Sequence, residues 1–354
     1  MQIPVMGNGL RVVFASLLLA GLASCAQPRV QHFPQHATRD PELNPAYATM
    51  PDGYRLPIST SRPEGPLRAV VLALHGFNDY RHAFHAPAAF FARHGILTVA
   101  YDQRGFGATA QRGLWAGARR MRQDARAMTQ LLCARYPGVP LYLLGESMGG
   151  AVVIESLQRP LPDCVAGAIL AAPAIWGWQT MPWWQTLVLR IAVHVAPAAT
   201  LTGQGLHIRA SDNLAMLRAL GRDPLVIKAT RIDTIYGLTN LMDAAYRDGD
   251  HLPVPVLLLY GEHDEVIPAS AMCRFRQRFF AAGGNDHAMM LYPAGYHMLL
   301  RDLDARVVLQ DVVDWILGRP LPSGDRVTAG DERLNRLCHP GRKLAATSGN
   351  GPDY

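Results

Sequence analysis

A serine in a G-x-S-x-G motif is the residue of this sequence best suited to nucleophilic chemistry. The motif, Gly145-Glu-Ser-Met-Gly149, stands between an apolar run typical of a strand and one typical of a helix. Glycines permit so tight a turn, which holds Ser147 in a strained conformation with its hydroxyl exposed. The positive end of the following helix favours the negative charge that develops during acyl transfer. The strand and helix context raises this motif above the many ordinary loops that match it.

A serine nucleophile needs a base and a carboxylate that orients the base. On a strand-turn-helix scaffold of this type, the acid and then the histidine follow the serine on the loops after later strands. Asp264 follows an apolar run at residues 254–260, and His297 follows another at residues 288–292. We therefore predict Asp264 as the acid and His297 as the base.

Neighbouring residues offer alternatives for both roles. Glu262 and Glu265 could replace Asp264, and His263 is a rival imidazole, but adjacent positions direct their side chains differently. We favour Asp264 over both glutamates. The remaining histidines are expected on the surface or in the core, and His75 is expected to bond to backbone rather than to transfer protons.

Two backbone N–H groups are needed to bind the tetrahedral oxyanion. One should come from Met148, the residue after the nucleophile, and the other from the loop after the strand at residues 69–74. In that loop His75 and Gly76 precede Phe77, and Gly76 lets the chain turn sharply. We predict the Phe77 and Met148 amides as the oxyanion hole.

The elements that must position these groups alternate between short apolar runs and amphipathic stretches. Each run suits a parallel strand buried on both faces, and the stretches place apolar residues on one helix face. This alternation predicts an α/β fold with a mostly parallel, doubly wound sheet. A hairpin is expected at residues 47–60, around Asp52 and Gly53. The predicted strands lie at residues 69–74, 96–101, 139–144, 166–172, 254–260 and 288–292.

One interval, residues 175–250, lacks a comparable strand and divides the predicted core into residues 45–174 and 251–320. It would lie over the carboxyl ends of the strands, where ligands bind in open α/β sheets, so we predict a helical lid. Its aromatic group could bind an acyl chain, although packing within the lid is an equal alternative. The group comprises Trp176, Trp178, Trp183 and Trp184. The tail at residues 321–354 is poor in large apolar residues and is predicted to be disordered.

The first 25 residues are interpreted as an export signal. An apolar run at residues 12–22 is about half the length of a membrane span and ends in Leu-Ala-Ser-Cys, which resembles a bacterial lipobox. Cys25 would then be lipidated, residues 26–44 would form a tether, and the protein would be anchored on the periplasmic face of the outer membrane. The alternative is a plain secretory signal, with Cys25 not involved.

Four further cysteines could pair in three ways in an oxidising compartment, and the sequence does not choose between them. Cys133 and Cys164 flank the strand of the motif and are the first pair to test for a disulfide. Unpaired buried thiols at these positions are an equal alternative. The other two are Cys273 and Cys338.

Composition argues against other classes of partner. The net charge of +6 comes from scattered arginines, which favours a solvated surface over nucleic-acid binding. The glycines at residues 102–107 lack the Lys-Ser/Thr ending of a phosphate loop, so this segment is interpreted as a structural turn. No Cys or His cluster has metal-ligand spacing, and neither a metal nor a cofactor is expected.

Taken together, these motifs resemble the α/β-hydrolase superfamily, specifically its monoacylglycerol lipase and bacterial lysophospholipase branch, which is sometimes grouped with serine aminopeptidases. The resemblance spans residues 47–319. It rests on the segments at residues 75–76, 101–107, 145–150, 211–214 and 236–243, and on the Asp264 and His297 loops. It implies an α/β-hydrolase that cleaves monoacylglycerol or lysophospholipid esters through an acyl-enzyme on Ser147. Glu146 departs from the animal lipases, which usually have His there.

Two other functions stay open. A peptidase or amidase of the aminopeptidase branch would need acidic lid groups for a substrate amine, and Asp212, Asp233 and Asp243 are candidates. A lipoprotein that binds lipid without catalysis is disfavoured because every catalytic position is intact. Dehalogenases and epoxide hydrolases are disfavoured because they use Asp at the nucleophile position.

Overall fold

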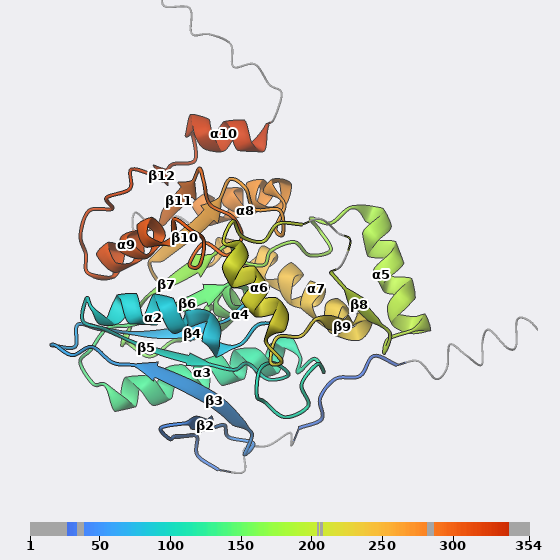
Figure 1. Ribbon diagram of the computed structural model, residues 1–354, viewed down its shortest axis with the longest axis horizontal. Helices are drawn as coiled ribbons and strands as arrows, with labels where there is room; N and C mark the ends of the chain where they lie inside the picture. Colours follow the sequence, from blue (N-terminus) through green and yellow to red (C-terminus); the bar gives the residue numbers. More distant parts are fainter. Residues whose placement is uncertain (1–26, 34–38, 204, 206–207, 282–286, 340–354) are drawn as a thin grey trace, which may run out of the picture.

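The computed structural model of the chain describes residues 27–33, 39–203, 205, 208–281 and 287–339 (Figure 1). A sheet of ten strands in the order β1-β2-β3-β5-β4-β6-β7-β10-β11-β12 runs through it. The six strands from β5 to β11 in this order are mutually parallel, and the flanking strands are antiparallel. The strands are β1 (Glu42–Leu43), β2 (Tyr47–Thr49), β3 (Arg55–Ser61), β4 (Ala69–Leu74), β5 (Ile96–Tyr101), β6 (Leu141–Glu146), β7 (Val165–Ala171), β10 (Val256–Gly261), β11 (Ala288–Tyr292) and β12 (Arg326–Val327).

The central strands are buried on both faces, as their continuous apolar sequences predict. Helices α3, α4, α7 and α8 share one hydrophobic cluster with the sheet, and α2 and α9 share the other. The doubly wound α/β fold is therefore confirmed. The helices of these two layers are α2 (His85–Ala92), α3 (Ala118–Arg135), α4 (Met148–Leu157), α7 (Ile232–Arg247), α8 (Ala269–Ala281) and α9 (Ala305–Ile316), with the short 3-10 helices η1 (Arg81–Phe84) and η2 (Asp248–Asp250).

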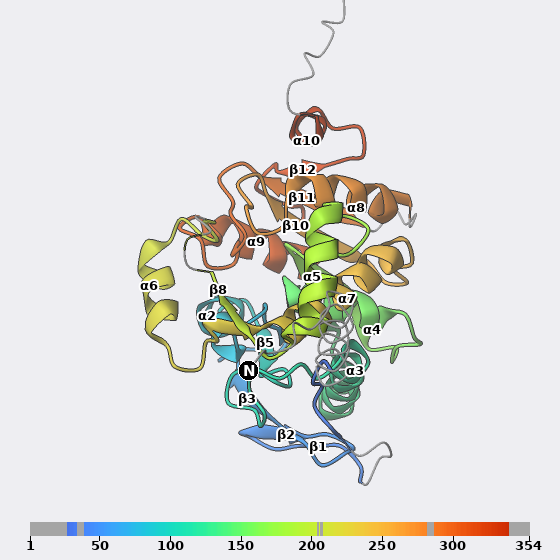
Figure 2. The ribbon, with the colours of Figure 1, turned by 90° about the vertical axis from the view of Figure 1, so that its right-hand side faces the viewer.

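The predicted lid contains helices and also a two-stranded sheet. Its helices are α5 (Trp183–Val195), α6 (Leu214–Arg222) and α7, and β8 (Thr200–Thr202) pairs antiparallel with β9 (Ala229–Arg231). Figure 2 shows α5 in front of the body and α6 to one side. Among the described helices, none combines the length and apolar character that crossing a bilayer requires.

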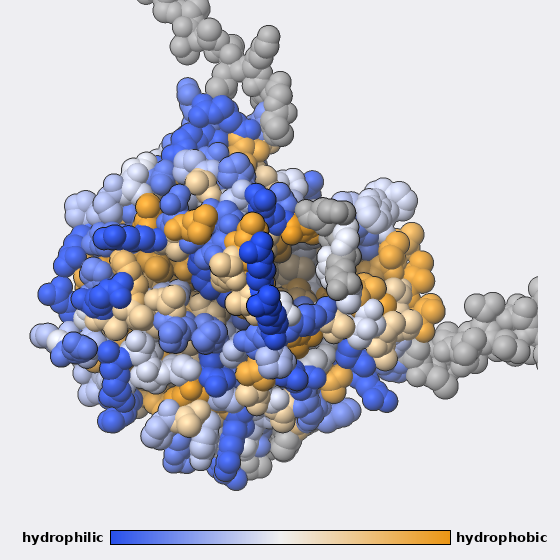
Figure 3. Space-filling view, viewed as in Figure 1, coloured by the Kyte–Doolittle hydropathy of each residue, from blue (hydrophilic) through white to orange (hydrophobic). Residues whose placement is uncertain are grey.

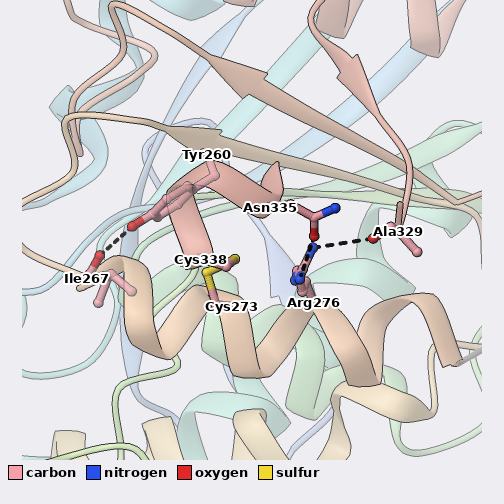
Figure 4. The surroundings of a disulfide bond; sticks show 7 residues. All are labelled: Tyr260, Ile267, Cys273, Arg276, Ala329, Asn335 and Cys338. Atoms are coloured by element: carbon pink, nitrogen blue, oxygen red, sulfur yellow. Dashed lines mark hydrogen bonds between the residues drawn. A yellow bond between two sulfur atoms is a disulfide. The ribbon is translucent and has the colours of Figure 1, made fainter. Parts of the chain in front are cut away.

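The prediction of a disordered tail is wrong for residues 321–339. These residues add β12 to the edge of the sheet and form α10 (Glu332–Cys338). A disulfide between Cys273 and Cys338 joins α10 to α8, and Arg276 donates to the Ala329 carbonyl and to the Asn335 side chain (Figure 4). A covalent bond, polar contacts and the buried side chains of Val327 and Leu334 thus hold this segment although large apolar residues are few. Residues 340–354 lie outside the described residues.

The prediction of a free tether at residues 26–44 is also wrong for its described part. The Gln31 side chain is buried and donates to the carbonyls of Gln111 and Leu114, while its amide donates to the Trp115 carbonyl. The Arg29 amide donates to the Asp233 carboxylate at 3.1 Å. Polar groups, together with the packing of Phe33 and Leu43 against the core, therefore hold this segment to the body. The predicted signal and Cys25 lie outside the described residues.

A hairpin of β2 and β3 turns at Gly53, as predicted, and it supplies one wall of a buried charge cluster. Arg104 is fully buried and makes two-pronged contacts with both Asp52 and Asp124 at 2.5–2.9 Å. Its guanidinium also lies over the ring of Tyr54, 4.2 Å from the ring centroid. A second disulfide, Cys133–Cys164, links the end of α3 to the segment before β7 and is the pair that the sequence favoured for testing.

Candidate active site

The turn between β6 and α4 has the geometry of a nucleophile elbow. Ser147 is the N-cap residue of α4 and has a φ of 52°, a strained conformation for a residue with a side chain. A Cβ added at Gly149 would lie 2.0 Å from the Leu74 carbonyl oxygen, and one at Gly145 would lie 2.4 Å from Gly149. Both motif glycines are therefore required by close backbone contacts on either side of the serine.

The acid and the base lie together on the loops after β10 and β11. His297 Nδ1 lies 2.9 Å from Asp264 Oδ2, and both side chains are buried. The other carboxylate oxygen of Asp264 accepts the amides of Val266 and Ile267 at 2.8 and 2.9 Å, which fixes its orientation. Since the Nδ1 proton points at the carboxylate, Nε2 is left to accept a proton.

The environment of His297 raises its basicity. Burial alone lowers the pKa of His297, but the charge of Asp264 and the hydrogen bond to it outweigh burial, so the pKa lies above its usual value. The Ser147 hydroxyl and this imidazole, both among the described residues, are not hydrogen-bonded to each other. Catalytic hydrogen bonds are often poorly aligned until substrate binds.

The loop after β4 passes beside the nucleophile. A Cβ added at Gly76 would lie 3.4 Å from Ser147 Cβ, which places the peptide that joins Gly76 to Phe77 next to the serine. The first amide of α4, that of Met148, has no partner within the helix because of its position. Both predicted oxyanion donors thus lie on segments that border Ser147.

His75 fixes this loop through backbone contacts. Its Nδ1 lies 2.8 Å from the Gly76 carbonyl oxygen, and its Nε2 accepts the Gln103 amide at 3.0 Å. Burial lowers the pKa of His75, which keeps the ring neutral. The predicted backbone role is therefore confirmed.

The rival acids and the rival imidazole have other partners. Glu262 pairs with Arg333 at 3.3 Å, and Glu265 accepts the Arg209 amide at 2.6 Å. His263 stacks on Tyr296. Among these neighbours, only Asp264 contacts the His297 imidazole.

The four tryptophans do not form one group. Trp176 packs against the core, and Trp178 donates to Asn240 and contacts Tyr236. Trp183 and Trp184 lie on α5, 76% and 53% exposed. The alternative of packing within the lid is therefore wrong for this pair, and the acyl-binding role of the group stays a prediction.

The segment before α6 is bound to the histidine loop. Ser211 donates to Asp302 at 2.6 Å, and Asn213 donates to the Arg301 carbonyl at 3.0 Å. The Met298 amide, next to His297, donates to the Ala210 carbonyl. The predicted lid is therefore coupled directly to the loop of the base, and Figure 3 shows the surface hollowed between α6 and α5.

The structure reveals a charge cluster that the sequence analysis missed. Arg301 lies 2.9 Å from Glu146 and 2.8 Å from Asp79, with all three side chains buried. Glu146 adjoins the nucleophile, and Arg301 follows the base by four residues. The unusual Glu146 was the only signal of this cluster in the sequence, and it did not identify the partners.

The glycine-rich segment at residues 102–107 is a structural turn, as predicted. Asp102 accepts the amides of Arg81 and Ala108, and a Cβ at Gly107 would lie 2.4 Å from that carboxylate. Within the described ranges, no group of three or more His, Cys, Asp or Glu side chains is placed to hold a metal ion.

The sheet order, the elbow and the Asp264–His297 pair define an α/β-hydrolase. Residues 65–304 match the family model described as serine aminopeptidase, S33. Because this match covers more than half of the chain, the protein belongs to that family.

Known relatives place the chain in the monoacylglycerol lipase-like branch of these hydrolases. It is 25% identical to a monoacylglycerol lipase of Mycolicibacterium smegmatis over 75% of this chain and 94% of that protein. It is 24% identical to a human monoglyceride lipase over 77% of this chain and 90% of that protein. These comparisons identify a carboxylic-ester hydrolase.

Solved structures share the fold. The monoacylglycerol lipase of Paleococcus ferrophilus has a TM-score of 0.62 at 21% identity and covers 74% of this chain and 98% of its own. A soluble variant of the Saccharomyces cerevisiae monoglyceride lipase, in complex with a substrate analog, has a TM-score of 0.65 at 21% identity over 81% and 98%.

Proposed function

We propose that this chain is a serine hydrolase that cleaves single-chain acyl esters, of the monoacylglycerol or lysophospholipid type, through an acyl-enzyme on Ser147. The observation that carries the proposal is the buried Asp264–His297 pair after β10 and β11, at the same edge of the parallel sheet as the strained Ser147 after β6. A raised imidazole pKa and a fixed Nε2 acceptor suit a general base.

The steps follow from these positions. His297 Nε2 removes the Ser147 proton as the hydroxyl oxygen attacks the ester carbonyl, and the oxyanion is bound by the Phe77 and Met148 amides. The imidazolium then protonates the departing alcohol, and water attacks the acyl-enzyme by the same route. Each oxyanion donor contributes about 3 kcal/mol to such a transition state.

The decisive experiment is Ser147→Ala, measured with p-nitrophenyl butyrate and with a fluorophosphonate probe. Turnover should fall by at least about 10⁴-fold and labelling should be lost, because the nucleophile is absent. Ser59→Ala, an exposed serine of β3 outside the predicted site, is the matched control and should keep both turnover and labelling. Retained turnover in Ser147→Ala would remove the serine from its role, and failure of the native protein to label would favour the non-catalytic lipid-binding alternative.

The substrate class is supported by the names of the relatives and by the hollow beside α6 (Figure 3). A bound hydrocarbon tail gains about 0.8 kcal/mol per buried methylene. Activity on glycerol monoesters should therefore rise as the acyl chain lengthens from acetate to palmitate. A steady fall over this series would contradict the acyl-chain proposal and leave the serine mechanism intact.

The peptidase alternative finds less support in the contacts of its candidate acids. Asp212 accepts the Leu303 amide, Asp233 pairs with Arg231, and Asp243 pairs with its own helix neighbour, Arg247. Carboxylates with such partners are poorly suited to hold a substrate amine. Comparing aminoacyl naphthylamides with glycerol esters would separate the two activities.

We further propose that lipidated Cys25 anchors the protein at a bacterial envelope membrane. The first described residues lie near the end of α5. The Arg29 amide donates to the Asp233 carboxylate, and the Asp233 amide donates to the carbonyl of Pro197, two residues after α5. The exposed face of α5 carries large apolar residues, visible as an apolar patch in Figure 3. They are Trp183, Trp184, Leu187, Val188, Ile191 and Val195. An acyl anchor and an apolar helix face on the same side would give the two signals that stable membrane attachment requires.

Cell fractionation tests the anchor. Cys25→Ala should move the exported protein from the membrane fraction toward the soluble fraction, and adding Leu187→Asp and Ile191→Asp on α5 should complete the release. Membrane recovery equal to that of the native protein in the triple variant would contradict this attachment.

A further inference from the structure

A buried guanidinium joins the three loops that carry the predicted catalytic groups. Arg301 belongs to the loop of His297, Glu146 is the last residue of β6 and is bonded to Ser147, and Asp79 lies in the oxyanion loop. The side chains of Arg301, Asp79 and Glu146 are 9%, 7% and 3% exposed. The ion pairs therefore lie inside the protein, behind the nucleophile.

Asp79 and Arg301 are in turn fixed to their own loops. The Asp79 amide donates to the Gly76 carbonyl, and its carboxylate accepts the Tyr80 amide at 2.8 Å. Arg301 donates its amide to the Met298 carbonyl. A shift of the guanidinium would thus be transmitted to the backbone beside the oxyanion donor and the base.

Stability alone does not account for this cluster. Two carboxylates share one guanidinium, and in the described part of the chain Glu146 Oε1 and Arg301 Nε have no hydrogen-bond partner. Burial raises the pKa of Glu146, although the Arg301 charge opposes this. Buried ion pairs often stabilise a fold no better than well-packed apolar side chains of the same volume. Some other role must favour charges at this position.

We propose that Arg301 is a positioning residue, which bridges Glu146 and Asp79 and so sets the placement of Ser147 and the Phe77 amide relative to His297. The inference rests on the serine mechanism proposed above. Arginine suits the task because its planar fork can hold two carboxylates in fixed directions, which a lysine ammonium cannot do.

The test is steady-state kinetics of Arg301→Met and Arg301→Lys with a soluble ester. A misplacement of about 1 Å in a reacting group can cost about 10²-fold in rate. We expect kcat of Arg301→Met to fall about 10²-fold, with KM within about threefold of the native value, since the binding surface for the acyl chain is not touched. The kcat of Arg301→Lys, which keeps the charge, should lie between the values of the native protein and of Arg301→Met. Arg301→Lys also serves as the test if Arg301→Met does not fold.

Arg276→Met is the matched control, because Arg276 is similarly buried but binds the tail segment, which carries none of the predicted catalytic residues. It should lower the unfolding temperature while the folded enzyme keeps its kcat. Adding Glu146→Gln to Arg301→Met should cost much less than Glu146→Gln costs alone, because residues of one network act together.

The outcomes separate the two proposals. If Ser147→Ala is inactive while Arg301→Met, or Arg301→Lys where Arg301→Met does not fold, keeps kcat within about threefold of native, the positioning role is overturned and the serine mechanism stands. If the kinetic loss in both Arg301 variants matches only the unfolded fraction, as in Arg276→Met, the role is likewise overturned. If Ser147→Ala retains turnover, the serine mechanism itself fails.

Discussion

Two buried arginines of this protein each hold two carboxylates, and they differ in how fully their polar atoms are paired. Arg104 makes two-pronged contacts with Asp52 and Asp124 and lies against an aromatic ring. Arg301 reaches Glu146 and Asp79 through single contacts, and one of its nitrogens is unpaired among the described residues.

This difference separates architecture from catalysis. The Arg104 cluster joins the hairpin, the β5 loop and α3, and complete pairing offsets the cost of burying its charges. The Arg301 cluster joins the loops around Ser147, where incomplete pairing is retained. Unpaired buried polar atoms are often found at functional sites. Incomplete pairing alone does not mark such a site, because Arg276 Nε is also unpaired among the described residues, so the position of the Arg301 cluster beside the predicted catalytic loops makes the difference.

The largest expected effect comes from the acid of the triad. Asp264→Asn should lower kcat about 10⁴-fold, because the imidazole loses its orienting carboxylate. The raised pKa of His297 depends on that carboxylate, so the acid limb of the residual kcat/KM should move to lower pH. A pH profile of kcat/KM for both proteins checks this. An acid limb at the native position would show that Asp264 does not set the imidazole pKa.

Disruption of the Arg104 cluster should lower the free energy of unfolding and leave catalysis unchanged. Arg104→Met leaves two buried carboxylates without their counter-charge and should cost about 3–5 kcal/mol of unfolding free energy. Denaturant titration measures the loss, and kcat per folded molecule should stay native. A fall in kcat like that expected for Arg301→Met would erase the contrast between the two clusters.

The Cys273–Cys338 disulfide should behave like the Arg104 cluster, because it joins α8 to α10 and involves none of the predicted catalytic residues. Replacing both cysteines by serine opens a crosslink across a sequence separation of 65 residues and should cost about 2–4 kcal/mol. Urea unfolding with parallel esterase assays checks that stability falls while activity persists. Unchanged stability would mean that the polar contacts of α10 and its buried Leu334 hold it without the disulfide.

The smallest effect compares one carboxylate from each cluster. Desolvation works to raise the pKa of Asp52, but Arg104 outweighs it and the pKa is lowered, so the charged form adds stability above the unfolded pKa that is lost as pH falls. The pKa of Glu146 is raised by burial, so its contribution is present below the unfolded pKa and is lost as pH rises.

At pH 7, Asp52→Asn should therefore cost about 1.5–3 kcal/mol, the range for hydrogen bonds to charged groups, and Glu146→Gln should cost less than about 1 kcal/mol. Unfolding titrations between pH 5 and pH 8 check both values. Equal losses would mean that the two clusters stabilise the fold alike.

Much of this arrangement could be predicted from the sequence because it depends on local patterns. Apolar runs identified the six parallel strands, and the spacing around Ser147 identified the elbow. Asp264 could be separated from its glutamate neighbours only weakly, since the sequence does not give side-chain directions. The structure resolves this by pairing Glu262 and Glu265 elsewhere.

Long-range pairing decided the rest. Nothing local in the sequence indicates that Gln31 reaches the loop at residues 111–115 or that Cys338 meets Cys273, so the tether and the tail were interpreted as loose. The exposure of Trp183 could not be predicted either, because the sequence does not show whether an apolar side chain faces the core or solvent.

The sequence by itself determined the succession of strands and helices along the chain, the candidate nucleophile and the chemistry that a serine, a histidine and an aspartate can perform, because these follow from residue type and short-range spacing. Only the tertiary structure decided that Arg301 stands between Glu146 and Asp79. These three residues are separated by up to 222 positions, and the folding of the sheet alone brings their charges together.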